Sequence, residues 1–140
     1  YFSYKPSQLY LVISDVKKYN EFLPYCKASE VYKLQKLEDK SYMEAKLTIG
    51  FLNFEESYTS KVKCWENKLI IAQNENSNLF KTLTNRWEIE SYGQGSRLKF
   101  HLDFELNSPL YHSVAKLYFE SIASEMVKAF ESRCQQLYSQ

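Results

Sequence analysis

The chain has 140 residues and a formal net charge of +1, a size that suits one domain with a core of its own. Acidic and basic residues nearly cancel and no basic run occurs, which argues against a nucleic-acid partner. No segment approaches the ~18 apolar residues of a membrane span. Aromatic residues make up 16% of the chain, which suits a lined cavity, a membrane-interface surface or a solid aromatic core.

The sequence offers no catalytic or metal-binding constellation. Its cysteines, Cys26, Cys64 and Cys134, are odd in number and widely spaced, so we expect buried reduced thiols rather than disulfides or a zinc site. The histidines, His101 and His112, have no cysteine or carboxylate at motif spacing, and we expect them on the solvated surface. The predictions are therefore no catalytic residue, no metal and no cofactor.

The N-terminal segment predicts one short strand and two short helices. Residues 1–4 alternate well enough for a strand, and because the chain opens on strand-like sequence we expect no targeting peptide in it. Pro6 and Ser7 open a helix, and residues 16–22 form a second one that ends at Pro24. Two short helices in tandem would close one end of a sheet.

From Cys26 onward the apolar period changes from helical to two, which predicts strands. We predict them at residues 28–34, 43–49, 57–64, 69–73, 83–90 and 97–104. Turns are predicted at 38–40, 67–68 and 93–95, an apolar loop at 51–54 and a polar loop at 74–78. Each strand has one apolar and one polar face, so the sheet should be covered on one side only.

Residues 108–137 predict one long helix. Ser108 supplies a capping hydroxyl and Pro109 suits the first helical position, where no backbone N–H is needed. Apolar side chains then recur in steps of three and four, with no glycine or proline, over a helix of roughly 40 Å. The predicted fold class is therefore α+β, with a curved antiparallel sheet of about six to seven strands wrapped around this helix. We place all of residues 1–140 in a single domain.

Two polar residues and two apolar loops are the candidates for function. Asn85 and Tyr58 lie on otherwise apolar strand faces, where each is either part of a structural hydrogen-bond network or a polar contact for a ligand. The loops at 51–54 and 79–80 would contact a membrane or partner if exposed, and would only cap the core if folded inward.

Residues 14–26 resemble the signature of the coenzyme Q-binding START-domain proteins, within the polyketide cyclase/START-like superfamily. The signature is Ser-Asp-Val, then Tyr19, then Phe-Leu-Pro-Tyr-Cys at 22–26, where Tyr25 replaces a frequent Trp. The segment 78–80, followed by Trp87, and the long closing helix also match, so the resemblance covers essentially the whole chain.

The resemblance implies a helix-grip fold with a hydrophobic tunnel between sheet and helix. It implies binding of ubiquinone or its prenylated precursors as ligands, by a lipid chaperone that supports respiration and coenzyme Q biosynthesis and is not an enzyme. The implied location is peripheral, on the matrix side of the inner mitochondrial membrane. Quinone-biosynthesis enzymes or respiratory complexes would be its partners.

The predicted site follows from the inward strand positions and the helix stripe. A quinone has two carbonyl oxygens and a long apolar tail, so it needs a few donors in an apolar tunnel. The predicted ligand-binding residues are Leu47, Ile49, Tyr58, Val62, Asn85, Trp87, Phe100, Leu102, Tyr118, Ile122, Met126 and Phe130. The predicted membrane or access loops contain Phe51, Leu52, Phe54, Leu79 and Phe80, and the family motif contains Pro24, Tyr25 and Cys26.

Two other function classes stay open at the level of sequence. A cyclase- or hydrolase-like enzyme would need an inward acid or base, and Glu30 and Glu56 are the only carboxylates that the alternation places there. A protein that acts only through interactions, as do bacterial relatives described as toxins or ribosome-association factors, would have a filled core and no bound lipid.

Overall fold

The computed structural model describes residues 1–51, 54–75, 80–107 and 112–138, with the side chains of 51, 54, 75 and 112–122 excepted. The chain forms helix α1 (Pro6–Ser14) and the 3-10 helix η1 (Val16–Glu21), then six strands and a long helix. The strands are β1 (Cys26–Lys36), β2 (Lys40–Phe51), β3 (Phe54–Trp65), β4 (Leu69–Glu75), β5 (Phe80–Tyr92) and β6 (Gly95–Leu106). Helix α2 (His112–Tyr138) closes the fold.

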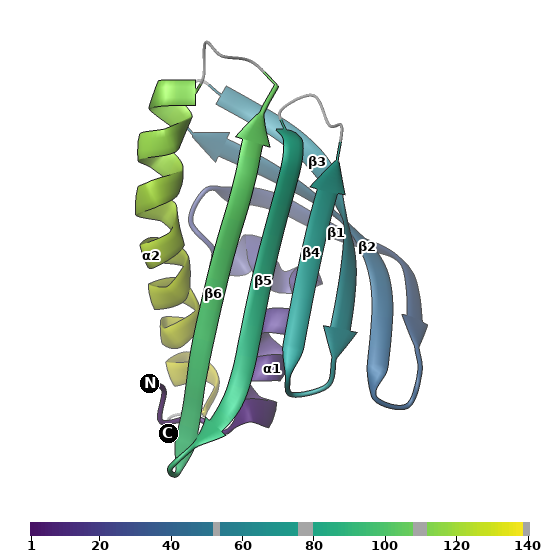
Figure 1. The fold of residues 1–140 in the computed structure, drawn as a ribbon, viewed down its shortest axis with the longest axis vertical. Coiled ribbons are helices and arrows are strands. Elements are labelled where there is room, and N and C mark those ends of the chain that lie inside the picture. Colours follow the sequence, from purple (N-terminus) through teal and green to yellow (C-terminus); the bar gives the residue numbers. More distant parts are fainter. Residues whose placement is uncertain (52–53, 76–79, 108–111, 139–140) are drawn as a thin grey trace.

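The strands form one antiparallel sheet in the order β1-β2-β3-β4-β5-β6 (Figure 1). Three turns, at residues 37–39, 66–68 and 93–94, are so short that each can only join antiparallel neighbours. At two of them a positive φ makes the turn, 62° at Asn67 and 60° at Gly93. Sequence neighbours are therefore also neighbours in space.

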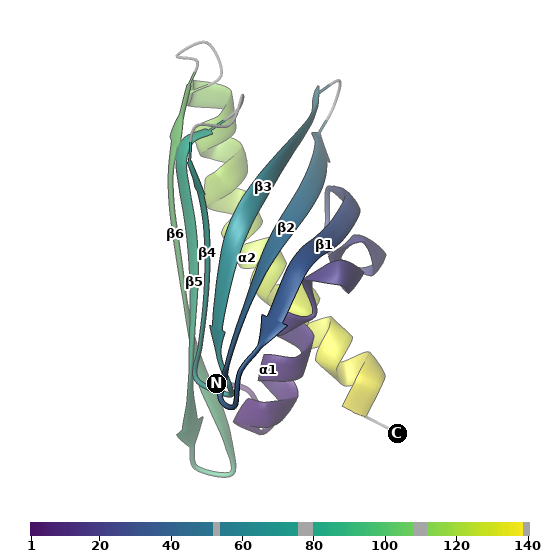
Figure 2. The ribbon, with the colours of Figure 1, turned by 90° about the vertical axis from the view of Figure 1, so that its right-hand side faces the viewer.

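The sheet is bent, and α2 lies across its concave side. Figure 2 shows β1–β3 in one arm of the bend and β4–β6 in the other, with α2 running obliquely across both. Helix α1 lies at the lower end of this arrangement, and η1 lies beside β1 (Figures 1 and 2). The α+β helix-grip fold predicted from the sequence is confirmed.

Alternation along the strands directs one set of side chains inward. In β6, Leu98, Phe100 and Leu102 are half-buried, whereas the residues between them are exposed. The main core joins α1, η1 and α2 to the sheet, and its buried members include Leu9, Ile13, Val62, Ile70, Trp87 and Phe130. A smaller cluster of Phe80, Leu83 and Leu106 lies at the other end of β5. Among the described side chains, the core that joins the helices to the sheet is thus separate from the cluster at the far end of β5.

The N-terminal segment is held by a single bridge rather than by the predicted strand. Phe2 pairs with Ser96, and the Ser96 hydroxyl donates to the Tyr4 carbonyl at 2.6 Å. A Cβ atom at Gly95 would lie 2.1 Å from the Phe2 carbonyl oxygen, so only glycine permits this approach. The prediction of a strand at residues 1–4 is therefore wrong.

Two predicted loops also differ from the structure. The apolar segment 51–54 is the tip of a hairpin in which Phe51 of β2 pairs with Phe54 of β3, and Leu52 lies outside the described residues. In the polar segment 74–78, Asn74 and Glu75 continue β4, and Asn74 is buried. The strands thus run further than polarity and glycine content predicted. The proposed helix start at Ser108-Pro109 lies outside the described residues.

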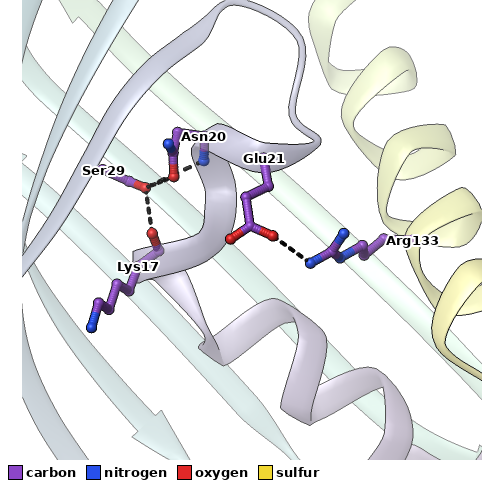
Figure 3. A network of polar contacts seen from close by, with 5 residues as sticks. All are labelled: Lys17, Asn20, Glu21, Ser29 and Arg133. Carbon is purple, nitrogen blue, oxygen red and sulfur yellow. Dashed lines mark hydrogen bonds and ion pairs between the residues drawn. The ribbon is translucent and has the colours of Figure 1, made fainter.

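Polar contacts tie η1 to both β1 and α2 (Figure 3). The Ser29 hydroxyl donates to the Lys17 carbonyl at 2.7 Å and accepts from the Asn20 backbone N–H at 3.3 Å. On the other side, Arg133 Nη2 donates to Glu21 Oε1 at 2.8 Å. These contacts hold η1 between the sheet and the long helix, where it forms one wall of the candidate site.

Candidate functional site

A cavity lies between the concave face of the sheet, η1 and α2, with a volume of about 90 Å³. Its wall on the η1 side consists of Val16, Tyr19, Leu23, Pro24 and Cys26. The sheet contributes Ala45, Leu47, Ile49, Tyr58, Ser60, Val62, Ile70, Ala72, Leu83, Asn85, Trp87 and Leu102, and α2 contributes Met126. The lining is mainly aliphatic and aromatic, with few polar groups, which is the composition of a site for an apolar ligand.

Three polar side chains of the lining have no hydrogen-bond partner among the described residues. Within the described part of the chain, no group forms a hydrogen bond with the side chains of Tyr58, Ser60 or Asn85. Burial raises the pKa of the Tyr58 hydroxyl well above its ordinary value, so it stays protonated and can donate. Ser60 is buried and the other two are half-buried, so these three side chains are available to bond a ligand or water.

Asn74 adds a fourth polar group on the same face. It is only 6% exposed, and its Nδ2 donates to the Thr59 carbonyl at 2.5 Å, while its Oδ1 accepts no hydrogen bond. An unpaired buried acceptor costs about 1–3 kcal/mol. The sequence analysis missed Asn74 because it placed this residue in a polar loop.

The family motif forms the turn from η1 into β1. Pro24 and Cys26 line the cavity, while Tyr25 has a φ of 65° and is 38% exposed. The Gly50 N–H donates to the Tyr25 carbonyl at 2.9 Å. The positive φ at Tyr25 turns the chain so that the residues on both sides of it can face inward.

The structure brings eight of the twelve predicted ligand-binding residues to the cavity. These are Leu47, Ile49, Tyr58, Val62, Asn85, Trp87, Leu102 and Met126. The side chains of Tyr118 and Ile122 lie outside the described residues. Placement on the lining does not test ligand contact, so the binding role of these residues stays a prediction.

Phe100 and Phe130 belong to the packing behind the cavity instead of its lining. The Phe100 ring stacks on Trp87 with 4.0 Å between centroids, and Phe130 meets Trp87 edge-on at 4.9 Å. Phe130 is 1% exposed and also contacts Tyr19 and Phe22 edge-on, at 5.4 and 5.3 Å. The helical stripe predicted that Phe130 faces inward but could not show that other rings surround it.

Phe80 is not part of an exposed access loop. It begins β5, is fully buried, and meets Tyr58 edge-on with 5.3 Å between ring centroids. Of the other predicted loop residues, Leu52 and Leu79 lie outside the described residues, as do the side chains of Phe51 and Phe54. For Phe80, the inward alternative left open by the sequence is the one that the structure shows.

Eight lining residues were missed from the sequence, three of them with a usable signal. Ala45, Ser60 and Leu83 each lie two residues from a predicted lining residue of the same strand, so extending the alternation along β2, β3 and β5 would have found them. Ile70 and Ala72 lie on β4, whose sequence at 69–73 is too uniformly apolar to show which face points inward. The other three, Val16, Tyr19 and Leu23, belong to the signature at 14–26, whose position in the fold is not visible in a strand pattern.

A second hollow of about 470 Å³ lies on the outside of η1, among α1, β1 and the end of α2. Leu11 and Leu34 in it are 62% and 61% exposed, and Lys17, Lys36 and Arg133 also line it. Because this groove is open and partly charged, it is poorly suited to enclose an apolar molecule. The inner cavity is the candidate site.

The described residues provide little for catalysis. The carboxylates considered for an enzyme, Glu30 and Glu56, are exposed and half-buried respectively, and neither lines the cavity. Burial raises the pKa of the Cys26 thiol to about 11, so this lining residue is a weak nucleophile at neutral pH.

Among the described residues no group of three or more His, Cys, Asp or Glu could hold a metal. No helix among them is long and apolar enough to cross a membrane.

Comparison with known proteins identifies the family. Residues 2–131 match the family described as polyketide cyclase / dehydrase and lipid transport. The chain belongs to this polyketide cyclase/START-like family. Its relatives include the mitochondrial coenzyme Q-binding proteins COQ10 of Dictyostelium discoideum, 36% identical over 96% of this chain, and of Schizosaccharomyces pombe, 35% identical over 91%. The chain spans 66% of the former and 78% of the latter.

The family also contains proteins named for other activities. The ribosome association toxin RatA of Escherichia coli is 28% identical over 97% of this chain and 84% of its own length. Among solved structures, an 18 kDa protein of Caulobacter crescentus has a TM-score of 0.81 at 24% identity, with coverage of 99% and 94%. The ZhuI aromatase/cyclase of Streptomyces has a TM-score of 0.83 at 12% identity, with coverage of 99% and 92%. At these identities the structures establish the fold alone.

Proposed function

We propose that this protein binds coenzyme Q, or a prenylated precursor of it, in the cavity between the sheet and α2, and acts as a carrier rather than an enzyme. The observation that carries the proposal is the lining, which is mainly apolar and contains, on its sheet side, polar side chains that have no hydrogen-bond partner among the described residues. The COQ10 relatives, at up to 36% identity, are named as coenzyme Q-binding proteins and supply the ligand class.

The chemistry of the lining fits such a ligand. The two carbonyl oxygens of a quinone ring can accept from Tyr58, Ser60 and the Asn85 amide, and the aliphatic lining suits the tail. Burying each CH₂ of the tail yields about 0.8 kcal/mol, but the bilayer offers nearly the same gain. Loading and unloading are therefore close to balanced, as a carrier requires.

The cavity must widen to take a whole ligand. Its volume of about 90 Å³ is well below the roughly 300–1,000 Å³ of a drug-sized ligand pocket. In this proposal, binding separates α2 or η1 from the sheet, and the empty protein closes again around its apolar walls. The closed state limits the exposure of apolar surface when no ligand is present.

The cellular setting is part of the same proposal. The relatives are named as mitochondrial proteins, and we place this carrier peripherally on the matrix side of the inner mitochondrial membrane. There it would take up quinone from the bilayer and deliver it to respiratory complexes or to enzymes of coenzyme Q biosynthesis. The tip around Phe51 and Phe54 is the proposed membrane contact.

Lipid extraction is the most direct test. The purified protein is extracted with organic solvent, before and after incubation with vesicles that contain ubiquinone, and the extract is analysed by mass spectrometry and quinone absorbance. We expect a stoichiometric quinone or prenylated precursor. Protein added to a mixture of loaded and empty vesicles should also accelerate quinone transfer between them.

Two alternatives make different predictions in the same experiment. An empty extract under both conditions, without any acceleration of transfer, would reject the carrier function and favour an interaction protein, as the name of the RatA relatives suggests for them. A bound molecule that is chemically altered during incubation would instead indicate an enzyme of the cyclase kind. The lack of a carboxylate in the described lining makes us expect no such alteration.

A further inference from the structure

Four polar side chains gather on the inward face where β3, β4 and β5 run side by side. Tyr58 and Ser60 are two residues apart on β3, so they share that face. The pair Lys61–Gln73 places Ser60 next to Asn74 across β3 and β4, and Asn74 Nδ2 bonds the Thr59 carbonyl at 2.5 Å. We call Tyr58, Ser60, Asn74 and Asn85 the inward polar cluster.

Asn85 completes the cluster on β5. Asn74 pairs with Leu83 and Ala72 pairs with Asn85, so the two asparagines are diagonal neighbours about 7–8 Å apart. Asn74 itself is not part of the lining, but Ser60 and Leu83, which flank it across the two strand pairs, both line the cavity. The cluster therefore adjoins the ligand space on the sheet side, opposite Met126 of α2.

The hydrogen-bonding capacity of the cluster is not symmetrical. Tyr58, Ser60 and Asn85 can each donate or accept, so they adapt to either kind of ligand oxygen. Asn74 Oδ1 can only accept, and it is buried and unpaired while its Nδ2 is engaged. Only a group that carries a hydrogen can satisfy this oxygen.

This asymmetry distinguishes two forms of the same ring. An oxidised quinone has only acceptor oxygens and leaves Asn74 Oδ1 unpaired. A quinol or another phenol presents O–H groups, one of which can donate to Asn74 while its oxygen accepts from a neighbouring hydroxyl or amide. We propose that the inward polar cluster makes this site selective for a phenolic head group, the quinol or a phenolic prenylated precursor, over the oxidised quinone. The inference rests on the proposed function and specifies its ligand.

The test compares three probes with the same decyl tail: a benzoquinone, its quinol and a simple phenol. Binding to the full chain is measured by equilibrium dialysis under anaerobic conditions. We expect the quinol to bind about tenfold more tightly than the quinone. Only the quinol satisfies the buried acceptor, and leaving such an acceptor unpaired costs affinity by a factor on the order of ten. By linkage, this tenfold preference raises the two-electron midpoint potential of the bound couple by about 30 mV.

The variant Asn74→Leu keeps the branched shape and the number of heavy atoms of the side chain, and it removes the Oδ1 acceptor together with the Nδ2 donor. It should lower quinol affinity to the level of the quinone and leave quinone affinity unchanged. Gln73→Leu, on the exposed face of the same strand, is the matched control and should retain the preference. The wild-type comparison decides the question even if Asn74→Leu does not fold.

Each outcome has one meaning. A phenol that binds as tightly as the quinol supports the selectivity and identifies phenolic precursors as ligands, whereas tighter quinol binding identifies the reduced quinone. Equal affinities of wild-type protein for quinol and quinone, tighter quinone binding, or a preference that survives in Asn74→Leu would overturn the inference but leave the carrier function intact. Failure of all three probes to bind would reject both.

Discussion

Burial keeps the thiols of this protein protonated at neutral pH. It raises the pKa of both Cys26, in the cavity wall, and Cys134, in the core, from the ordinary value of 9.0 to about 11. The Cys64 pKa is also raised by burial. Removing a thiolate from water is unfavourable, so the folded state resists ionisation that the unfolded chain undergoes freely. The expectation of buried reduced cysteines, made from spacing and odd number, agrees with three free cysteines of which two are fully buried.

This difference predicts a loss of stability at alkaline pH. The raised thiol pKa contributes to the free energy of unfolding, and this contribution is fully present below pH 9.0. It is lost as the pH rises through about 11, because the unfolded chain releases its thiol protons at lower pH than the folded protein does. Urea unfolding at several pH values should show the decline in that window. At pH 8 the native thiols should also react with a disulfide reagent about a hundredfold more slowly than unfolded ones.

Replacing Cys26 by alanine provides the control, since it should remove the contribution of the cavity thiol and leave that of Cys134. Reaction rates that level off near pH 9 in the native protein would show that these thiols ionise as in water.

At the scale of elements, an aromatic cluster and an ion pair help to fasten the described C-terminal half of α2, and Tyr138 near its end donates to the Gln8 carbonyl. Phe130 lies against Tyr19, Phe22 and Trp87, which come from η1, the segment after it and β5. One helix turn further, Arg133 pairs with Glu21 and lies over the Phe22 ring at 5.1 Å. The C-terminal half of α2 is thus held to both the sheet and η1, next to the cavity that Met126 lines.

Truncation of this anchor should be costly. We expect Phe130→Ala to lower the free energy of unfolding by about 3–5 kcal/mol, since it removes a fully buried ring and leaves a hole among three others. Urea denaturation followed by circular dichroism measures the loss. Glu131→Ala, an exposed neighbour on the same helix, should change stability by less than about 0.5 kcal/mol. A loss below 1 kcal/mol for Phe130→Ala would mean that α2 is not anchored there.

At the scale of the whole molecule, the bent sheet and the helix enclose a space that neither could form alone. Two small lining residues, Ala45 and Ala72, face this space from β2 and β4. Larger side chains at these inward positions would complete the core and leave no cavity. Because these two side chains are small, they leave room for a ligand, and the interior is packed less completely as a result.

Filling the space should abolish binding. A bound ligand at one hundred times its dissociation constant should stabilise the wild type by about 2.7 kcal/mol and raise its melting temperature. We expect Ala72→Phe to lose this ligand-dependent shift, because its ring occupies the cavity, with a cost in stability of about 1–3 kcal/mol from overpacking. Gln73→Phe, on the exposed face of β4, should keep the shift. An unchanged shift in Ala72→Phe would place the ligand elsewhere.

The sequence by itself determined the elements and the faces that they present. Alternation in β6 and the helical stripe that includes Met126 and Phe130 are local patterns, and local steric and hydrophobic rules suffice to interpret them. The motif at 14–26 identified the family for the same reason, since it is a contiguous stretch. The ends of the strands were predicted less accurately than their existence. Strand β4 was predicted to end at residue 73 but continues to Glu75, because pairing with β5 outweighs the low strand propensity of asparagine.

Only the tertiary structure decided which inward residues face the cavity and which are packed behind it. Phe100 and Phe130 have the same inward pattern as Trp87 and Met126, yet the first two pack against the Trp87 ring and do not line the cavity. The sequence predicts a loop at Asn74, whereas strand pairing places it inside with an unpaired oxygen. The physical reason is that a strand or helix pattern specifies a direction for each side chain, whereas a cavity depends on how neighbouring side chains from distant segments fill the volume between them.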